Sequence, residues 1–520
     1  MKKIIKILLI FAFVFSFGTS VFALEEIELA NQEIPITEGA TLSLEECINI
    51  ALQRSPRIKE MRYYWQMAKH NVSIAKAQYA PTISAGAGYN QGWDRSRHRT
   101  TDTRILPSVD ARLREMIWNF GKTNANIRME KFYKIAAEHD FNQEVIDTIY
   151  TVKVKYYAVL AAQAIVEIDK ANVQINERNY QRTKAYFEEG IRSKIDLVNA
   201  EVYLSDSKIT LVQAEKDYKN AIIALSNAMY VANAPRFSIK KTETFNFDDD
   251  YLPVNLMKIT KYHDISELPD DVYNAVLTKH EKREEMLKDY VFKNKFPMSF
   301  EESVQYAYDH RYDLKSLEAT KEAMKQALLY TKREYYPELS GSVGYGFMNT
   351  NMYNNNSFDI AVELTSSLNP IQTKHKIDNA KIQVNIAQND IDQLKQDMYF
   401  SIQKTYVDMI ALEEQIPLNA VKVRQTLENL ELADGRYEVG LGDFIEVQDA
   451  KVNYNIAQNT YVKNIFNYNV SRATMEKEIS SEEIKIKLEE DIKKVKKDEK
   501  KKEKKDKPKT KKDENKEENK

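Results

Sequence analysis

The sequence predicts an α+β membrane protein made of two tandem repeats, each with a long α-helical hairpin and a β-hairpin. One observation is internal similarity, because 42–89 aligns without a gap on 298–345 and Pro81 recurs as Pro337. A second is the strand-like alternation that follows each of these prolines. A third is the scarcity of breakers, 13 Gly and 12 Pro among 520 residues, which requires long elements.

The composition excludes several classes of protein. With 43% hydrophobic and 30% charged residues, the chain is too polar for a membrane protein of many helices. Cys47 is the only cysteine, and the seven histidines lack metal-site spacing, so we expect no disulfide, metal or cofactor. No catalytic motif occurs, which indicates a non-enzyme. The formal net charge is −2, with lysine-rich ends around a mildly acidic body, which argues against nucleic acid as a partner.

The N-terminus has the pattern of an export signal. Lys2 and Lys3 precede an apolar stretch over 7–17, and short residues lead to Ala23. We therefore expect 1–23 to be a signal peptide cleaved after Ala23, followed by an N-terminal extension over 24–41. No later segment has the roughly 18 consecutive apolar residues of a membrane-spanning helix.

Both repeats follow the order helix, two strands, very long helix, returning helix. Ser43 and Glu46 have the spacing of a capping box, and the helix that they begin is predicted to run unbroken over Leu44–Tyr79. The expected divisions are a first repeat over 42–232, a linker over 233–297 and a second repeat over 298–479.

Each predicted β-hairpin is apolar on one face and small or charged on the other. The expected strands are about 82–93 and 105–116, joined by a polar loop over 94–104, and about 338–348 and 358–366. Lipid outside and water inside a transmembrane β-barrel require this alternation. The residues expected to face lipid are Tyr89, Val343, Tyr345 and Val362. Those expected to face the lumen are Asp110, Arg112 and Glu363.

The helices after the hairpins set the length of the molecule. The stretch 122–188 contains no Gly or Pro, so a continuous helix would extend about 100 Å. Its counterpart, 374–438, is interrupted only by Pro417, where we expect a kink or local break. Gly190 and Gly440 then turn the chain into the returning helices, so each repeat ends in a glycine turn at its tip.

Four strands per chain are too few to close a membrane barrel. An unclosed edge in lipid leaves backbone groups without hydrogen bonds, so the chain must oligomerise around an axis. Three copies would give twelve strands, whereas two would give eight and leave no conduit. Four copies also remain compatible with the sequence.

The C-terminal 480–520 is rich in Lys and Glu and contains no aromatic residue. Such a segment cannot bury a core, so we expect a largely disordered, solvated tail. The alternative is a basic tail that contacts an anionic cell-wall polymer.

The assembled motifs resemble the TolC-like outer membrane efflux proteins. The resemblance covers about 42–479 and is carried by the start of each repeat, by the helix ends at Pro81 and Pro337, and by the tip segments Gly190–Ala200 and Gly440–Ala450. It implies a homotrimer with a twelve-stranded barrel in the outer membrane, continued by an α-helical tunnel through the periplasm. It also implies a periplasmic adaptor and an inner-membrane pump as partners.

The tips are the expected gate and the expected adaptor contact. Glu446 and Asp449 share one helix face, so threefold symmetry would multiply them into a ring of carboxylates, and the resemblance places the family's acidic constriction on them. Asp196 is the candidate from the first repeat, with helix capping as its alternative role. The arginine that helps to latch the family's gate corresponds to Gly442 here. The residues expected at the tip turns and adaptor contact are Gly190, Gly440, Tyr437 and Gly442.

The predicted function is an outer-membrane exit duct of a tripartite efflux or type I secretion system. The alternative is a coiled-coil envelope spacer or surface stalk without a conduit. The apolar strand faces favour the duct, since a spacer would have no use for a lipid-facing surface.

Overall fold

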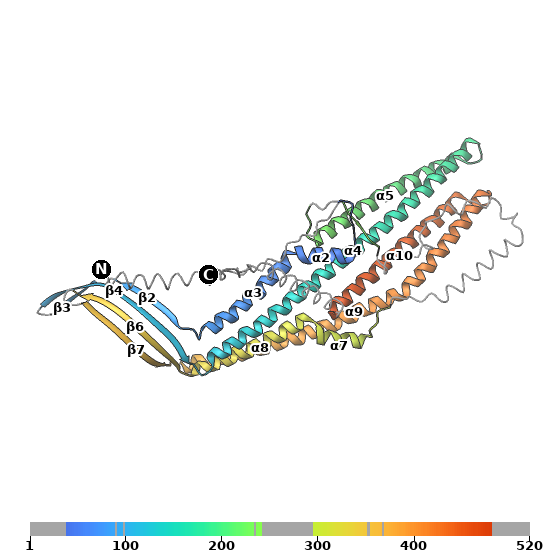
Figure 1. Ribbon diagram of the computed structural model, residues 1–520. Coiled ribbons are helices and arrows are strands. Elements are labelled where there is room, and N and C mark those ends of the chain that lie inside the picture. Colours follow the sequence, from blue (N-terminus) through green and yellow to red (C-terminus); the bar gives the residue numbers. More distant parts are fainter. Residues whose placement is uncertain are drawn as a thin grey trace, which may run out of the picture.

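A computed structural model describes residues 38–88, 91–96, 99–232, 236–241, 295–350, 354–366 and 369–480 of the chain. The molecule is elongated, with a curved β-sheet at one end and long helical hairpins reaching away from it (Figure 1). The expected signal peptide, most of the N-terminal extension and the linker, and the tail beyond Ser480 lie outside the described residues.

Within the described residues, eight α-helices form two similar sets. Those of the first repeat are α2 (Leu44–Arg54), α3 (Pro56–Ala77), α4 (Lys122–Glu188) and α5 (Lys194–Ala228). Those of the second are α7 (Phe300–His310), α8 (Tyr312–Lys332), α9 (Pro370–Glu438) and α10 (Phe444–Ile479). The two extended hairpins α4–α5 and α9–α10 therefore match the predicted order.

The prediction of one unbroken helix over Leu44–Tyr79 is wrong, because the chain leaves the helical conformation at Ser55. Pro56 disfavours the helical conformation in the residue before it, and Ser55 has ψ 118°. The Ser55 hydroxyl then accepts a hydrogen bond from the Ile58 amide at 3.3 Å and begins α3. In the second repeat the same break falls at Arg311, with ψ 130°.

We expected a kink or a local break at Pro417. The helix α9 continues through this residue without a break. Proline removes one intrahelical hydrogen bond. Ile416 and Ala420, on either side, are buried in the hydrophobic core, so packing keeps both halves of the helix in place.

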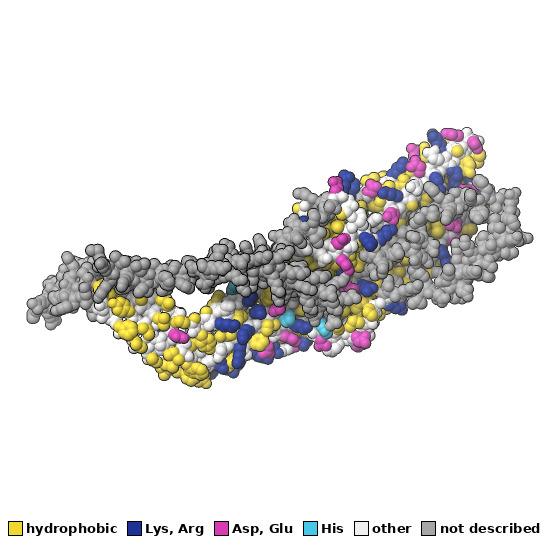
Figure 2. Space-filling model, in the orientation of Figure 1, with side chains coloured by type: hydrophobic (Ala, Val, Ile, Leu, Met, Phe, Trp, Pro, Cys, Tyr) yellow, Lys and Arg dark blue, Asp and Glu magenta, His cyan; other side chains and the backbone are white. Residues whose placement is uncertain are grey.

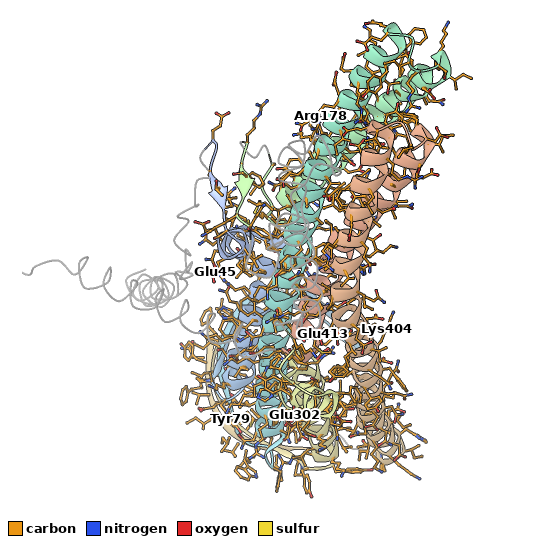
Figure 3. The ribbon with its side chains drawn as sticks, turned by 90° about the vertical axis from the view of Figure 1, so that its right-hand side faces the viewer. Glu45, Tyr79, Arg178, Glu302, Lys404 and Glu413 are labelled. Carbon is orange, nitrogen blue, oxygen red and sulfur yellow. The ribbon has the colours of Figure 1, made fainter. Side chains whose placement is uncertain are left out.

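Three helices begin with a capping box in which a serine and an acidic residue bond to each other's backbone amides. The pairs are Ser43 with Glu46, Ser193 with Asp196, and Ser299 with Glu302. The capping box predicted at Ser43 is confirmed. Figure 3 labels Glu45 in the first turn of α2 and Glu302 in that of α7.

The strands form an antiparallel sheet in the order β2-β4-β6-β7, with β3 also pairing with β4. Their bounds are β2 (Thr82–Gly88), β3 (Gln91–Ser96), β4 (Arg99–Trp118), β6 (Glu338–Thr350) and β7 (Asn354–Thr365). The prediction of a polar loop over 94–104 is wrong, because Gln91–Ser96 pairs residue for residue with Arg99–Arg104. Backbone hydrogen bonds between two neighbouring polar segments suffice for this extension, which needs no apolar face.

A two-stranded parallel sheet, β1 (Thr41–Leu42) with β5 (Ser238–Ile239), packs beside the middle of α4. The buried Tyr156 hydroxyl of α4 donates to the carbonyl oxygens of Leu42, at 3.3 Å, and Lys240. It thereby ties the segment after α5 to the start of the first repeat.

No helix within the described part of the chain is long and apolar enough to cross a membrane.

Replacing Tyr156 with Phe is expected to loosen the β1–β5 sheet, because the carbonyl groups of Leu42 and Lys240 lose the hydroxyl donor that they share. The expected cost is about 1–3 kcal/mol of stability. Thermal unfolding and limited proteolysis around 236–241 measure it. Tyr64→Phe, at an exposed position on α3, is the matched control. Equal behaviour of both variants would contradict the role of Tyr156.

Candidate functional site

One face of the sheet is apolar and exposed. Val343 lies opposite Leu113 on β4 and Ile360 on β7, and Tyr345 lies opposite Phe358. The exposed fractions are 40% for Val343, 47% for Tyr345 and 69% for Val362. Hydrophobic side chains accordingly gather over the sheet end of the molecule (Figure 2). Tyr89, expected on the same face, lies outside the described residues.

The other face is polar, and its charges meet across the strands. Asp110, Arg112 and Glu363 occupy the register positions between the apolar residues. An Nη2 of Arg112 lies 3.5 Å from an Oδ2 of Asp359, and Arg114 donates to the Ser340 hydroxyl at 3.1 Å. The period-two pattern thus placed the three predicted lumen residues on one surface.

Glycines on the polar face make room for the carboxylates. A Cβ at Gly86 would lie 2.6 Å from an oxygen of Asp110, and one at Gly344 would lie 2.5 Å from an oxygen of Asp359. Gly344 stands between Arg112 and Asp359 in the register, so the two charges reach each other over it. The absence of side chains there keeps the charged groups close to the sheet.

The two tips turn in the same way. Gly190 and Gly440 both have φ +76°, a conformation that other residues adopt at a cost. The next amide closes each turn, Ile191 onto the Tyr186 carbonyl at 2.8 Å and Leu441 onto the Arg436 carbonyl at 2.9 Å. Ile191, Val439 and Leu441 are exposed there, so each tip presents aliphatic side chains to its surroundings.

Gly442 leaves little space for a side chain. A Cβ at this position would lie 3.0 Å from the Tyr437 amide nitrogen and 3.1 Å from the Arg436 carbonyl carbon. The latching arginine implied by the resemblance therefore cannot be placed here without moving the turn.

The three predicted gate carboxylates have separate environments. Asp196 accepts from the Ser193 hydroxyl at 2.9 Å and from its amide, which is the capping alternative. Glu446 pairs with Arg436 at 3.1 Å, on the same hairpin. Asp449 is exposed. Within the described residues no hydrogen bond or ion pair joins Asp196 to Glu446 or Asp449.

The sequence analysis missed two arginines that join the tips within one chain. Arg182 of α4 pairs with Asp434 at 2.6 Å and with Glu438 at 2.8 Å, both on α9. Arg192, just beyond the first tip, donates to the Tyr437 carbonyl at 3.4 Å. We call Arg182, Arg192 and Tyr437, with the two carboxylates, the tip clamp.

Tyr437 lies at the centre of the tip clamp. The guanidinium carbons of Arg182 and Arg192 lie 5.2 Å and 4.5 Å from the centre of its ring, within the range of cation–π attraction. The Tyr437 side chain is buried, so the adaptor contact expected for it does not fit its position. The sequence contained a signal for this contact, because Arg192 lies two residues after Gly190. A cation beside one glycine turn can reach the matching glycine turn of the other hairpin.

Electrostatics keep Arg182 charged although it is largely buried. Burial by itself disfavours the charge, but the hydrogen bond that Arg182 donates to Asp434 and the attraction of both carboxylates outweigh it, so the pKa of Arg182 is raised. Arg182 therefore stays charged in the tip clamp.

The fold is shared with solved outer-membrane channels. The crystal structure of the CmeC outer membrane channel from Campylobacter jejuni superposes with a TM-score of 0.65, covering 86% of this chain and 88% of that one at 14% identity. At this identity the likeness concerns the fold alone.

The chain belongs to the outer membrane efflux protein family, whose sequence profile matches residues 47–229 and 304–477. Among individual relatives, the outer membrane protein TolC of Vibrio cholerae is 22% identical over 36% of this chain and 44% of its own length. The alkaline protease secretion protein AprF of Pseudomonas aeruginosa is 22% identical over 33% of this chain and 36% of its own length. The chain thus spans less than half the length of these relatives in the matched regions. Membership places the protein in the outer membrane and confirms the resemblance seen in the sequence.

Replacing Arg182 with Ala is expected to weaken the contact between α4 and α9, because Asp434 and Glu438 lose their partner. The expected cost is about 1–3 kcal/mol of local stability. Faster amide hydrogen exchange over 430–446 measures it. Arg178→Ala, an exposed arginine one turn away on α4 that Figure 3 labels, is the matched control. Unchanged exchange in the Arg182 variant would show that the clamp contributes nothing.

Proposed function

We propose that three copies of the chain form an outer-membrane exit duct, which passes small molecules or proteins outward from a periplasmic adaptor and an inner-membrane pump. The observation that carries this proposal is the sheet, which is apolar and exposed on one face and charged on the other. Such a sheet fits a barrel wall between lipid and water.

The edges of the sheet support an assembly of several copies. β2 and β7 stand at the two ends of the strand order, and within the described residues each pairs on one side only. Joining β7 of one copy to β2 of the next would satisfy both edges, and three copies would close twelve strands.

The helices offer surfaces for the same assembly. Apolar side chains remain exposed along α5 at spacings of mostly three, four or seven residues, which is a coiled-coil stripe without a partner among the described residues. They are Ile195, Val198, Val202, Ile209, Val212 and Ile223. A second stripe on α9 comprises Ile382, Ile386, Phe400, Val407 and Ile410. Packing of these stripes between copies would enclose a helical tunnel below the barrel.

The tips would form the periplasmic entrance, and the exposed aliphatic residues Ile191, Val439 and Leu441 are suited to adaptor contact. Glu446 and Asp449 would line the constriction, with Asp110, Arg112 and Glu363 in the barrel lumen. A non-conducting envelope spacer is the alternative, and the exposed apolar sheet face favours the duct over it.

The double replacement Glu446→Ala with Asp449→Ala is expected to reduce cation selectivity roughly several-fold and to weaken block by trivalent cations, because carboxylate rings concentrate cations. Single-channel conductance in planar bilayers measures both. Glu188→Ala with Glu189→Ala removes the same charge at the other tip and serves as the control. Unchanged selectivity would refute the ring, and absence of any conductance in the natural chain would support the spacer.

Val362→Arg is expected to prevent assembly, because a charge facing lipid near the midplane costs about 2–4 kcal/mol per copy. The neighbouring Ala361→Arg points to the polar face and should be tolerated. Mass measurement of the protein extracted in detergent gives the trimer fraction for each variant. A stable monomer in the natural chain, or equal losses in both variants, would overturn the assembly.

A further inference from the structure

The first β-hairpin extends farther from the helices than the second. β4 pairs with β6 up to Ile105, which lies opposite Thr350, the last residue of β6. Beyond that point β3 (Gln91–Ser96) pairs with the segment Arg99–Arg104 of β4, and we call these two segments the outer ribbon. Its six residue pairs, at about 3.3 Å each, reach roughly 20 Å past the end of β6. The outer ribbon lies at the end of the molecule farthest from the helical hairpins (Figure 1).

An extra residue in β4 interrupts the register where the outer ribbon begins. Ser108 of β4 lies opposite Met348 of β6. The next pair away from the helices is Ile105 with Thr350, so β4 takes three residue steps where β6 takes two. This is a β-bulge, in which one strand holds one residue more than its partner.

The pairing on the other side of β4 shows the same β-bulge. Ser108 lies opposite Gly88 of β2. Arg104 lies opposite Gln91 of β3, so four steps along β4 match three along the facing segment. Pro107 falls within the bulge, where proline is tolerated because the ladder is already interrupted. Two separate pairings therefore place the bulge at the same residues of β4.

The bulge exchanges the two faces of β4. Nearer the helices, Val109 and Leu113 lie on the exposed apolar face. Thr350 continues the polar face of β6, because residues two apart in a strand share a face, and its partner Ile105 lies on the same side. Successive residues alternate, so Arg104 occupies a position on the side of the apolar face. We call this side of the ribbon its outer face.

The outer face of the ribbon holds two arginines and a tryptophan. In order away from the bulge, the facing pairs on it are Gln91 with Arg104, Trp93 with Asp102, and Arg95 with Thr100. Asp102 is the one acidic residue among these six positions. Without the extra residue, β4 would place Thr103 and Thr101 on this face instead. The bulge therefore brings charged positions onto the surface that continues the apolar face.

These positions lie at the level of lipid headgroups. The last apolar residue of the exposed face on β6 is Phe347, and Asn349 follows it on that face. Arg104 stands four steps beyond Phe347, which is about 13 Å along the strand and roughly 10 Å in height at a tilt of about 40°. The polar layer of a bilayer begins where the hydrocarbon ends. Because the helices reach into the periplasm, this layer belongs to the outer leaflet of the outer membrane.

We propose that the outer face of the ribbon binds the phosphate groups of lipid headgroups in the outer leaflet. Arginine presents a planar fork of N–H donors that matches phosphate oxygens, and tryptophan is favoured at a membrane interface. The segment 91–104 contains four arginines against two aspartates, so its charge complements an anionic surface. The proposal rests on the proposed barrel, which sets the height of the ribbon relative to lipid, and it adds recognition of a lipid class by its headgroup.

Native mass spectrometry of the full chain in detergent tests the proposal, with diphosphoryl lipid A as the probe and a metal chelator present. The chain should bind this glycolipid roughly 20-fold more tightly than the same glycolipid without its phosphates, since each arginine near an anionic surface contributes about five-fold. Equal binding of the two glycolipids would overturn the proposal. Displacement of the glycolipid by an equal concentration of inorganic phosphate would also overturn it, because the site would then bind a free anion.

Variants assign the binding to the outer face. Arg104→Gln should weaken binding of diphosphoryl lipid A roughly five-fold, and Asp102→Asn, which removes a like charge, should strengthen it by a similar factor. Arg99→Gln is the matched control, because it makes the same change on the same strand but on the polar face, and it should bind like the natural chain. Equal weakening by Arg99→Gln, or unchanged binding in Arg104→Gln, would refute the assignment.

The same spectra report how many chains each particle contains. A trimer that does not distinguish the two glycolipids would refute the lipid surface and not the duct. A monomer that keeps the preference for phosphate would refute the proposed assembly and not the lipid surface.

Discussion

The unpaired edges of the sheet are the constraint on which the rest of the structure depends. β2 and β7 each carry a row of backbone donors and acceptors that the described chain leaves unpaired on one side. In an outer membrane protein such groups need partners, because lipid offers none. The sheet is apolar on one face and charged on the other, which fits the proposed closure of several copies around an axis. The unpartnered apolar stripes of α5 and α9 present the same requirement along the helices.

Stability is distributed unevenly along the molecule, and α4 shows how. Near the sheet and in its middle, α4 contacts α2, α3, α8 and β5 through apolar side chains. Towards the tip it faces α10 through amides, a buried lysine and a buried aspartate, and ends in the arginine clamp. A helix bound by apolar packing at one end and by exchangeable polar contacts at the other is expected to have its lowest local stability at the tip.

The prediction from sequence was most successful where a local rule fixes the outcome. Period-two alternation placed Val343 and Val362 on one face and Asp110 and Glu363 on the other, because successive side chains of a strand must point to opposite sides. It failed where two rules competed. The helical pattern over Leu44–Tyr79 concealed the break at Ser55, and the polar composition of 94–104 concealed two strands that pair with each other.

The repeat, the faces of the strands and the glycine turns at Gly190 and Gly440 could be predicted from the sequence alone, as could an expectation of export, since each is encoded by spacing or composition over a short window. Which charged groups contact each other became clear from the folded arrangement of the helices. Arg182 reaches Asp434, and Lys451 reaches Asn176, across more than two hundred residues of chain. Their partners depend on the relative axial position of two helices, which no single helix encodes. That position follows from the packing of all the long helices together.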